Sequence, residues 1–88
     1  MKSITIQVTQ EDINAGIQKN TSSCAIALAL KRQLGHYNLS VCSLSVLIEG
    51  KRYKTSNEIA TFVHDFDNKK ALVFPAEFLL DLSEPISV

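Results

Sequence analysis

The sequence predicts an α+β fold, a two-layer single domain in which an antiparallel sheet of about four to five strands packs on a central buried helix and a second amphipathic helix. Three observations predict it: an apolar run from Cys24 to Leu30, an apolar stripe at helical spacing from Ile59 to Phe66, and alternating apolar residues in the flanking segments. The length of 88 residues fits one domain spanning 1–88, with 83–88 as a tail.

The central helix is expected within residues 22–35, SSCAIALALKRQLG. Alanine and leucine dominate it, and Ile26 is the only β-branched residue between Cys24 and Leu34. A helix that is apolar nearly all round is a buried helix. Gly35 should end it, and three hydroxyl side chains compete to cap its start: Thr21, Ser22 and Ser23.

A half-buried strand should precede this helix, because apolar and polar residues alternate over residues 4–8. Thr9 then resembles an N-cap, with Asp12 three residues later in the acidic position of a capping box. A short helix follows, and Gly16 should end it. Its apolar face is expected to carry Ile13 and Ile17.

Residues 39–54 read as β-structure. The alternation of apolar and polar residues changes phase across Cys42-Ser43, so that apolar residues move from odd to even positions. This change indicates either a bulge or a turn between two short strands. Glu49-Gly50 fits a two-residue hairpin turn. The returning strand is 51–54, with Tyr53 as its inward or interface residue.

The second helix should begin after a cap at residues 55–57. Its stripe at i, i+3, i+4 and i+7 consists of Ile59, Phe62, Val63 and Phe66. Residues 67–70 are expected to form a turn. Pro75 argues against a central strand around it, and the alternation over 78–82 predicts a last strand.

Composition narrows the class of protein. Hydrophobic residues make up 45% of the chain, which is typical of a folded domain, and the net charge of zero argues against a dedicated nucleic-acid binder. The apolar run is too short to span a bilayer, and the N-terminus lacks the pattern of a signal peptide. Cys24 and Cys42 fit free thiols of a cytoplasmic protein.

The sequence offers no local signature for catalysis, so we expect no enzyme and no cofactor. Ser22, Ser23 and Cys24 could act as nucleophiles, but no catalytic motif flanks them, and His36 and His64 fit surface or rim positions. The two cysteines and two histidines lack the spacing of a zinc site, so no metal is expected.

Two segments could bind a ligand. The lead-in to the central helix combines hydroxyls, an amide and a cation, and a helix N-terminus suits phosphate; its residues are Lys19, Asn20, Thr21, Ser22 and Ser23. The pair Arg52 and Tyr53 could hold a phosphate and stack a base. The alternatives are simple capping by a polar loop for the first segment, and an edge strand protected by lysines for the second.

A domain of this size leaves little room for a deep cavity once the central helix fills its core. A tight ligand site is therefore expected between protomers, which predicts a homo-oligomer.

Residues 8–13, VTQEDI, with Gly16 and then CAIALALKR at 24–32, resemble a family of small phage and bacterial proteins. The family pattern is a strand, a T-x-E-x-I-x-x-G turn and a C-P-I/V-A-x-A-L helix; here Ala25 stands where proline is usual. The later Tyr53, Phe66-Asp67, Pro75 and Phe78 are similar to that pattern too. The resemblance covers most of the chain and implies a phage context without an established activity.

Small phage proteins without catalytic motifs often act against host defence. The resemblance and the candidate ligand segments together predict a non-enzymatic, oligomeric sponge that sequesters a phosphate-bearing nucleotide immune signal, for example a cyclic nucleotide. The alternative is a protein-interaction inhibitor of a host defence complex, as anti-CRISPR proteins are.

Overall fold

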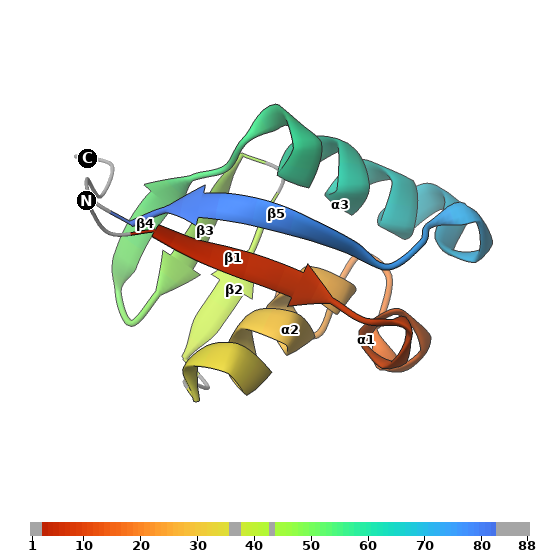
Figure 1. Ribbon diagram of the computed structural model, residues 1–88, viewed down its shortest axis with the longest axis horizontal. Coiled ribbons are helices and arrows are strands. Elements are labelled where there is room, and N and C mark those ends of the chain that lie inside the picture. The colour runs from red at the N-terminus through yellow and green to blue at the C-terminus, as the bar shows by residue number, and fades with distance from the viewer. Residues whose placement is uncertain (1–2, 36–37, 43, 83–88) are drawn as a thin grey trace.

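A computed structural model describes residues 3–35, 38–42 and 44–82 of the chain (Figure 1). The α+β class is confirmed. In chain order the elements are β1 (Ser3–Val8), α1 (Gln10–Ala15), α2 (Ala25–Leu34), β2 (Leu39–Val41), β3 (Ser45–Ile48), β4 (Lys51–Lys54), α3 (Asn57–Lys69), the short 3-10 helix η1 (Lys70–Leu72) and β5 (Ala76–Asp81).

The strands form two antiparallel sheets rather than the one sheet we expected. The first and last strands pair with each other over six residues on each strand, from Ser3 opposite Asp81 to Val8 opposite Ala76. The other three strands form a meander in the order β2-β3-β4. The ring of Phe62 on α3 meets the ring of Phe78 on β5 edge-on, with centroids 5.3 Å apart, so β5 packs against α3. Strands β4 and β5 belong to different sheets and form no ladder with each other.

The core lies between the two sheets and the helices α2 and α3. Helix α2 runs beside β1, and α3 runs beside β5 (Figure 1). Five residues of α2 are buried: Ala25, Ile26, Ala27, Ala29 and Leu30. They meet buried side chains from both sheets, such as Ile6, Val46 and Leu80. This helix is thus the buried centre that the sequence predicted. Within the described residues, no helix combines the length and the hydrophobicity that crossing a membrane requires.

The capping box at α1 is confirmed. Thr9 Oγ1 accepts from the Asp12 N–H at 3.2 Å, and Asp12 Oδ2 accepts from the Thr9 N–H at 2.9 Å. Arg32 of α2 also donates to Asp12 Oδ2 at 2.7 Å, so one carboxylate joins two helices. Gly16 ends α1 as expected, but Ile17 lies beyond the helix and is 54% exposed, so its placement on the apolar face was wrong.

The start of α2 differs from the prediction. Its N-cap is Cys24, which makes no side-chain cap hydrogen bond, and none of the three hydroxyl residues before it takes that position. The reason is that residues 21–23 form a turn, in which Asn20 Oδ1 accepts from the Ser22 N–H at 3.0 Å. At the other end, Gly35 adopts the left-handed conformation with φ 71°, as expected for a helix terminator.

The prediction of a bulge or a turn across Cys42-Ser43 includes Ser43, which lies outside the described residues. The strands on either side, β2 and β3, pair in unbroken antiparallel register, so the chain reverses direction between them. Leu44, one of the apolar residues of that stretch, points outward and is 79% exposed. The hairpin between β3 and β4 is confirmed. Glu49 and Gly50 both have positive φ, at 49° and 83°, as a type I′ turn requires. Tyr53 is half-buried against the core.

All four residues of the predicted stripe on α3 are buried. Ser56 caps the helix, its Oγ accepting from the Ile59 N–H at 3.3 Å. The turn expected at 67–70 was wrong, because α3 continues to Lys69 and passes directly into η1. Contacts from a distant segment hold this extension: the Lys19 N–H donates to Asp67 Oδ1 at 2.8 Å, and the Gln18 side-chain amide donates to the Asp67 carbonyl at 3.2 Å. The last strand is confirmed, but it runs over Ala76–Asp81 rather than 78–82, and it begins directly after Pro75. The tail at 83–88 lies outside the described residues.

The outer edge of β1 is closed by a side chain of α2. Gln33 Oε1 accepts from the Gln7 N–H at 2.7 Å, and Gln33 Nε2 donates to the Thr5 carbonyl at 2.8 Å. One amide group thereby satisfies two backbone groups, as a neighbouring strand would do. This arrangement protects an edge that could otherwise pair with another chain.

Replacing Gln33 with alanine should lower the free energy of unfolding by about 1–2 kcal/mol, because two hydrogen bonds at a partly exposed edge are lost. Urea denaturation measures the change. Gln10→Ala is the matched control, since that amide donates to the Asn14 side chain within the same helix, at 2.9 Å. Equal losses in the two variants would contradict an edge-closing role for Gln33.

Candidate functional site

A hollow of about 380 Å³ lies at the N-terminal end of α2. We call it the α2 hollow. Three parts of the fold form its wall: the loop before α2, the end of β2 and the C-terminal half of α3. The residues that line it are Lys19, Asn20, Thr21, Cys24, Val41, Cys42, Val63, His64, Asp67 and Asn68.

The loop on one side of the hollow is fixed by hydrogen bonds to α3. Lys19 has a positive φ of 58°, and its N–H donates to Asp67 Oδ1 at 2.8 Å. The Gln18 side-chain amide donates to the carbonyls of Phe66 and Asp67 at 3.0 and 3.2 Å. Because these groups are held in place before any ligand arrives, little ordering cost falls on binding.

Backbone hydrogen bonds also join the loop before α2 to strand β2, and join the end of this loop to its first residues. The Val41 N–H donates to the Thr21 carbonyl at 2.8 Å, and the Ile17 N–H donates to the Ser23 carbonyl at 2.8 Å. Lys31 reaches back along α2, and its Nζ donates to the Ser22 carbonyl at 2.6 Å. A second cation is therefore held at the entrance to α2, beside the positive end of the helix dipole.

Two free thiols line the same hollow in different environments. Cys24 is buried, and burial raises the pKa of its thiol above the ordinary value, although the nearby N–H groups of Ala27 and Ile26 oppose that change. Cys42 is exposed. Cys24 is therefore a protonated, packed thiol, whereas Cys42 is open to reagents.

The structure brings together part of the predicted ligand site. Lys19, Asn20 and Thr21 line the α2 hollow, while Ser22 and Ser23 belong to the adjoining turn and do not line it. The second predicted pair lies elsewhere. Tyr53 borders a separate hollow of about 240 Å³ with Leu34 and Leu82, and Arg52 is exposed on β4.

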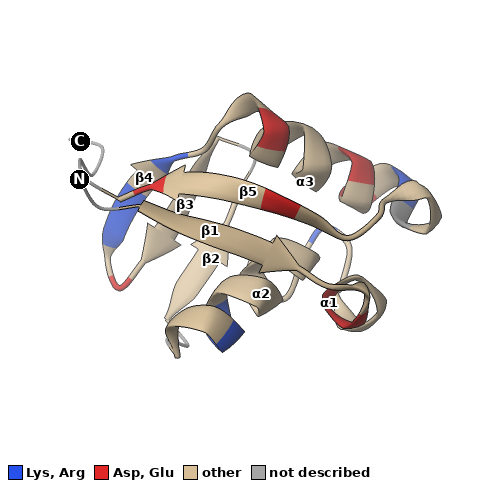
Figure 2. Ribbon diagram, viewed as in Figure 1, with Lys and Arg blue, Asp and Glu red and all other residues tan. Residues whose placement is uncertain are grey.

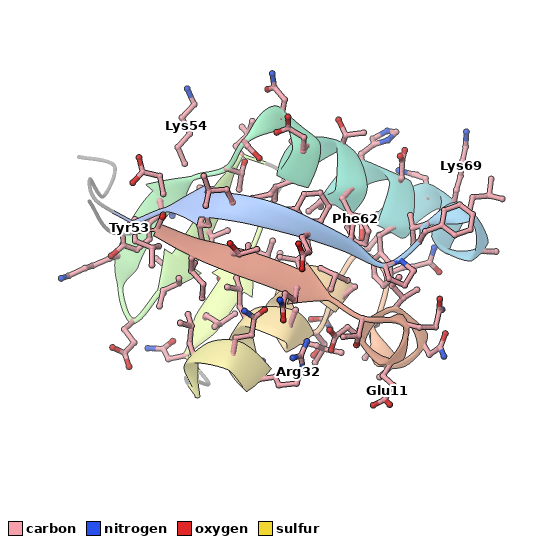
Figure 3. The ribbon with its side chains drawn as sticks, viewed as in Figure 1. Glu11, Arg32, Tyr53, Lys54, Phe62 and Lys69 are labelled. Atoms are coloured by element: carbon pink, nitrogen blue, oxygen red, sulfur yellow. The ribbon has the colours of Figure 1, made fainter. Side chains whose placement is uncertain are left out.

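Figure 3 shows Tyr53 near one end of the molecule and Lys69 near the other, so strand β4 and the end of α3 are far apart. The two predicted segments therefore do not form one site within a single chain.

Sequence reasoning missed the lining residues that come from distant segments: Cys42, His64, Asp67 and Asn68. No local pattern marks them, because only the packing of α3 against the loop and β2 brings them to one place. His64 is largely exposed, and its Nδ1 lies 3.5 Å from Asp65 Oδ1. In the part of the chain that the structure describes, no group of three or more His, Cys, Asp or Glu side chains could hold a metal ion.

No family model, curated protein or solved structure matches this chain. The resemblance to small phage and bacterial proteins therefore stays a prediction.

Proposed function

We propose that this protein is a non-catalytic binding protein that takes a small phosphate-bearing ligand of nucleotide type in the α2 hollow. The observation that carries the proposal is the position of this hollow, which is bordered by the uncapped N-terminus of α2 and by the lysine and amide side chains of its lead-in loop. Helix N-termini favour anions through their free N–H groups and their dipole.

The size and lining of the hollow support the same ligand class. A volume of about 380 Å³ lies at the lower end of the range of small-molecule sites. Lys19, Asn20 and Thr21 offer hydrogen-bond donors, and Val41 and Val63 offer apolar surface for a base or a sugar. A single chain contains this hollow, so the prediction that a ligand site must lie between protomers is not required by the fold.

The biological role that we propose is that of a phage counter-defence sponge, which sequesters a nucleotide immune signal in the host cytoplasm without degrading it. The support for this role is the sequence resemblance together with the polar hollow. A sponge needs tight binding and no chemistry, and the Cys24 thiol in the wall of the hollow is buried.

Thermal unfolding of the whole protein with a panel of cyclic dinucleotides and cyclic ADP-ribose tests the proposal. A ligand at a hundredfold excess over its Kd stabilises the folded state by about 2.7 kcal/mol, which raises Tm by roughly 10 °C or more in a domain of this size. Inorganic phosphate and unphosphorylated nucleosides are the controls. The absence of a shift with every phosphate-bearing compound would overturn the proposal.

Charge changes at the hollow should alter affinity in opposite directions. Lys19→Ala should weaken binding of an anionic ligand about fivefold, and Asp67→Asn should strengthen it by a similar factor, because an exposed pair of charges contributes up to about 1 kcal/mol. Asparagine retains an oxygen that can accept from the Lys19 N–H. Lys51→Ala on β4 is the matched control, and titration calorimetry measures all three. Weaker binding by Asp67→Asn would rule out an anionic ligand here.

Cys42 provides a reporter of occupancy. Native alkylation with iodoacetamide should modify the exposed Cys42 and spare Cys24, whose burial raises its pKa and blocks access. A ligand in the α2 hollow should slow the modification of Cys42, which peptide mass spectrometry follows over time. If a ligand that raises Tm leaves this rate unchanged, it binds elsewhere.

A further inference from the structure

A second surface, on the side of α3 that faces β5, is unrelated to the α2 hollow. One shallow hollow of about 390 Å³ is lined by Asn57, Glu58, Thr61, Phe62, Asp65 and Phe78. An adjoining one of about 330 Å³ is lined by Ser56, Glu58, Glu77, Phe78 and Leu79. Since the two share Glu58 and Phe78, they form one continuous groove between the start of α3 and β5, which we call the acidic groove.

The floor of the acidic groove is apolar. Phe62 projects from α3 toward β5 (Figure 3), where its ring meets Phe78 edge-on with centroids 5.3 Å apart. Leu79 continues the apolar surface along the groove and is 63% exposed. A partner would gain stability by covering this surface.

The rim of the groove is acidic. Glu58 and Asp65 border it from α3 and Glu77 borders it from β5, and none of the described residues that line it is lysine or arginine. Figure 2 shows acidic positions on both α3 and the neighbouring strand β5. The Gln7 amide donates to Glu77 Oε2 at 3.2 Å and His64 lies beside Asp65, but neither supplies a fixed positive charge to the groove. A neutral or acidic partner would bury these carboxylates at a desolvation cost, whereas a cationic one would pair with them.

The chain itself carries a strand of the opposite charge. Strand β4, Lys51–Lys54, is the edge of the three-stranded sheet and holds three exposed cations, Lys51, Arg52 and Lys54. It adjoins the acidic groove, because only Thr55 and Ser56 separate Lys54 from the first residue of α3. In Figure 3, Lys54 projects outward on the side where α3 begins.

We infer that the occupant of the acidic groove is strand β4 of a second copy of this chain, in a two-fold dimer. Because the basic strand and the acidic groove are neighbours on one surface, a two-fold axis lets each copy place its β4 against the groove of the other. Both contacts form at once and the assembly closes at two copies. The net charge of zero agrees with attraction between copies, because no overall repulsion opposes it.

Charge reversal tests the dimer. Sedimentation velocity of the whole protein should show a monomer–dimer equilibrium that weakens as salt rises, since the attraction between exposed charges is screened. Glu58→Lys and Lys54→Glu should each weaken the dimer about a hundredfold, because each reversal replaces an attractive pair by a repulsive one in both symmetric contacts, at about tenfold for each contact. An equal mixture of the two variants should associate more tightly than either variant alone, because the opposed charges are complementary again.

Glu11→Lys is the matched control, because Glu11, like Glu58, is an exposed acidic residue in the first turn of a helix but lies on α1. It should leave the equilibrium unchanged, and circular dichroism verifies that each variant folds. A wild-type monomer at every concentration and salt would overturn the inference, as would a dimer that tolerates both reversals. A monomer that captures a synthetic basic peptide through Glu58 would reassign the groove to a different protein. None of these outcomes depends on a ligand in the α2 hollow.

Discussion

Replacing Phe66 with alanine should lower the free energy of unfolding by about 3–5 kcal/mol. This ring is only 1% exposed and packs at 6.4 Å between centroids with Phe62 on the same face of α3. Its tip also fills the space directly above Gly16, so one side chain joins α3 to the end of α1. Alanine would leave a cavity at this junction, and the lost contacts add to the lost transfer free energy.

Urea denaturation followed by circular dichroism measures this change. Phe74→Ala is the matched control, because that phenylalanine is 74% exposed and should cost little. Since the total free energy of unfolding of a small domain is about 5–15 kcal/mol, Phe66→Ala alone could remove a large share of the stability. The milder Phe66→Leu keeps the measurement within range. Losses of similar size at positions 66 and 74 would contradict the packing described above.

Gly16→Ala should destabilise the protein by about 1–3 kcal/mol, for a steric reason. A Cβ atom at Gly16 would lie 2.7 Å from Phe66 Cζ and 2.9 Å from both the Ala25 nitrogen and the Asp12 oxygen. Two of these neighbours are backbone atoms and cannot rotate away. The φ of Gly16 is −67°, which any residue adopts, so backbone strain plays no part.

Gly35→Ala separates this effect from conformational strain. Open space surrounds Gly35, but its φ of 71° disfavours a side chain, so alanine should cost about 1–2 kcal/mol through the backbone alone. The double variant Gly16→Ala, Phe66→Leu should lose less than the sum of the single losses, because the smaller side chain relieves one of the contacts. Strict additivity would show that Phe66 does not meet position 16.

Features that depend on neighbours in the sequence could be predicted from it. The capping box needs only Thr9 and Asp12, the I′ turn needs only Glu49-Gly50, and the buried stripe of α3 follows from helical spacing. In each case the interacting groups lie within a few residues, so the pattern and the interaction coincide.

The candidate site could be predicted only in part. The lead-in loop was identified because helix entrances favour polar residues, and three of its residues line the α2 hollow. The opposite wall comes from residues 42, 63–64 and 67–68, whose approach depends on the packing of α3. Long-range contacts also explain why α3 continues through residues 67–69, a segment that resembled a turn in the sequence. Asp67 in this segment accepts a hydrogen bond from the distant Lys19.

The sequence by itself determined the α+β class, the buried alanine-rich helix and the order and type of most elements, because hydrophobic periodicity and local hydrogen bonds are encoded residue by residue. Tertiary structure alone decided that the strands divide into two sheets, that Cys24 rather than a hydroxyl begins α2, and that Arg52 and Tyr53 lie apart from Lys19. These outcomes depend on how helices and strands pack against one another. Packing brings together residues that are far apart in the sequence, so no local pattern predicts which of them will meet.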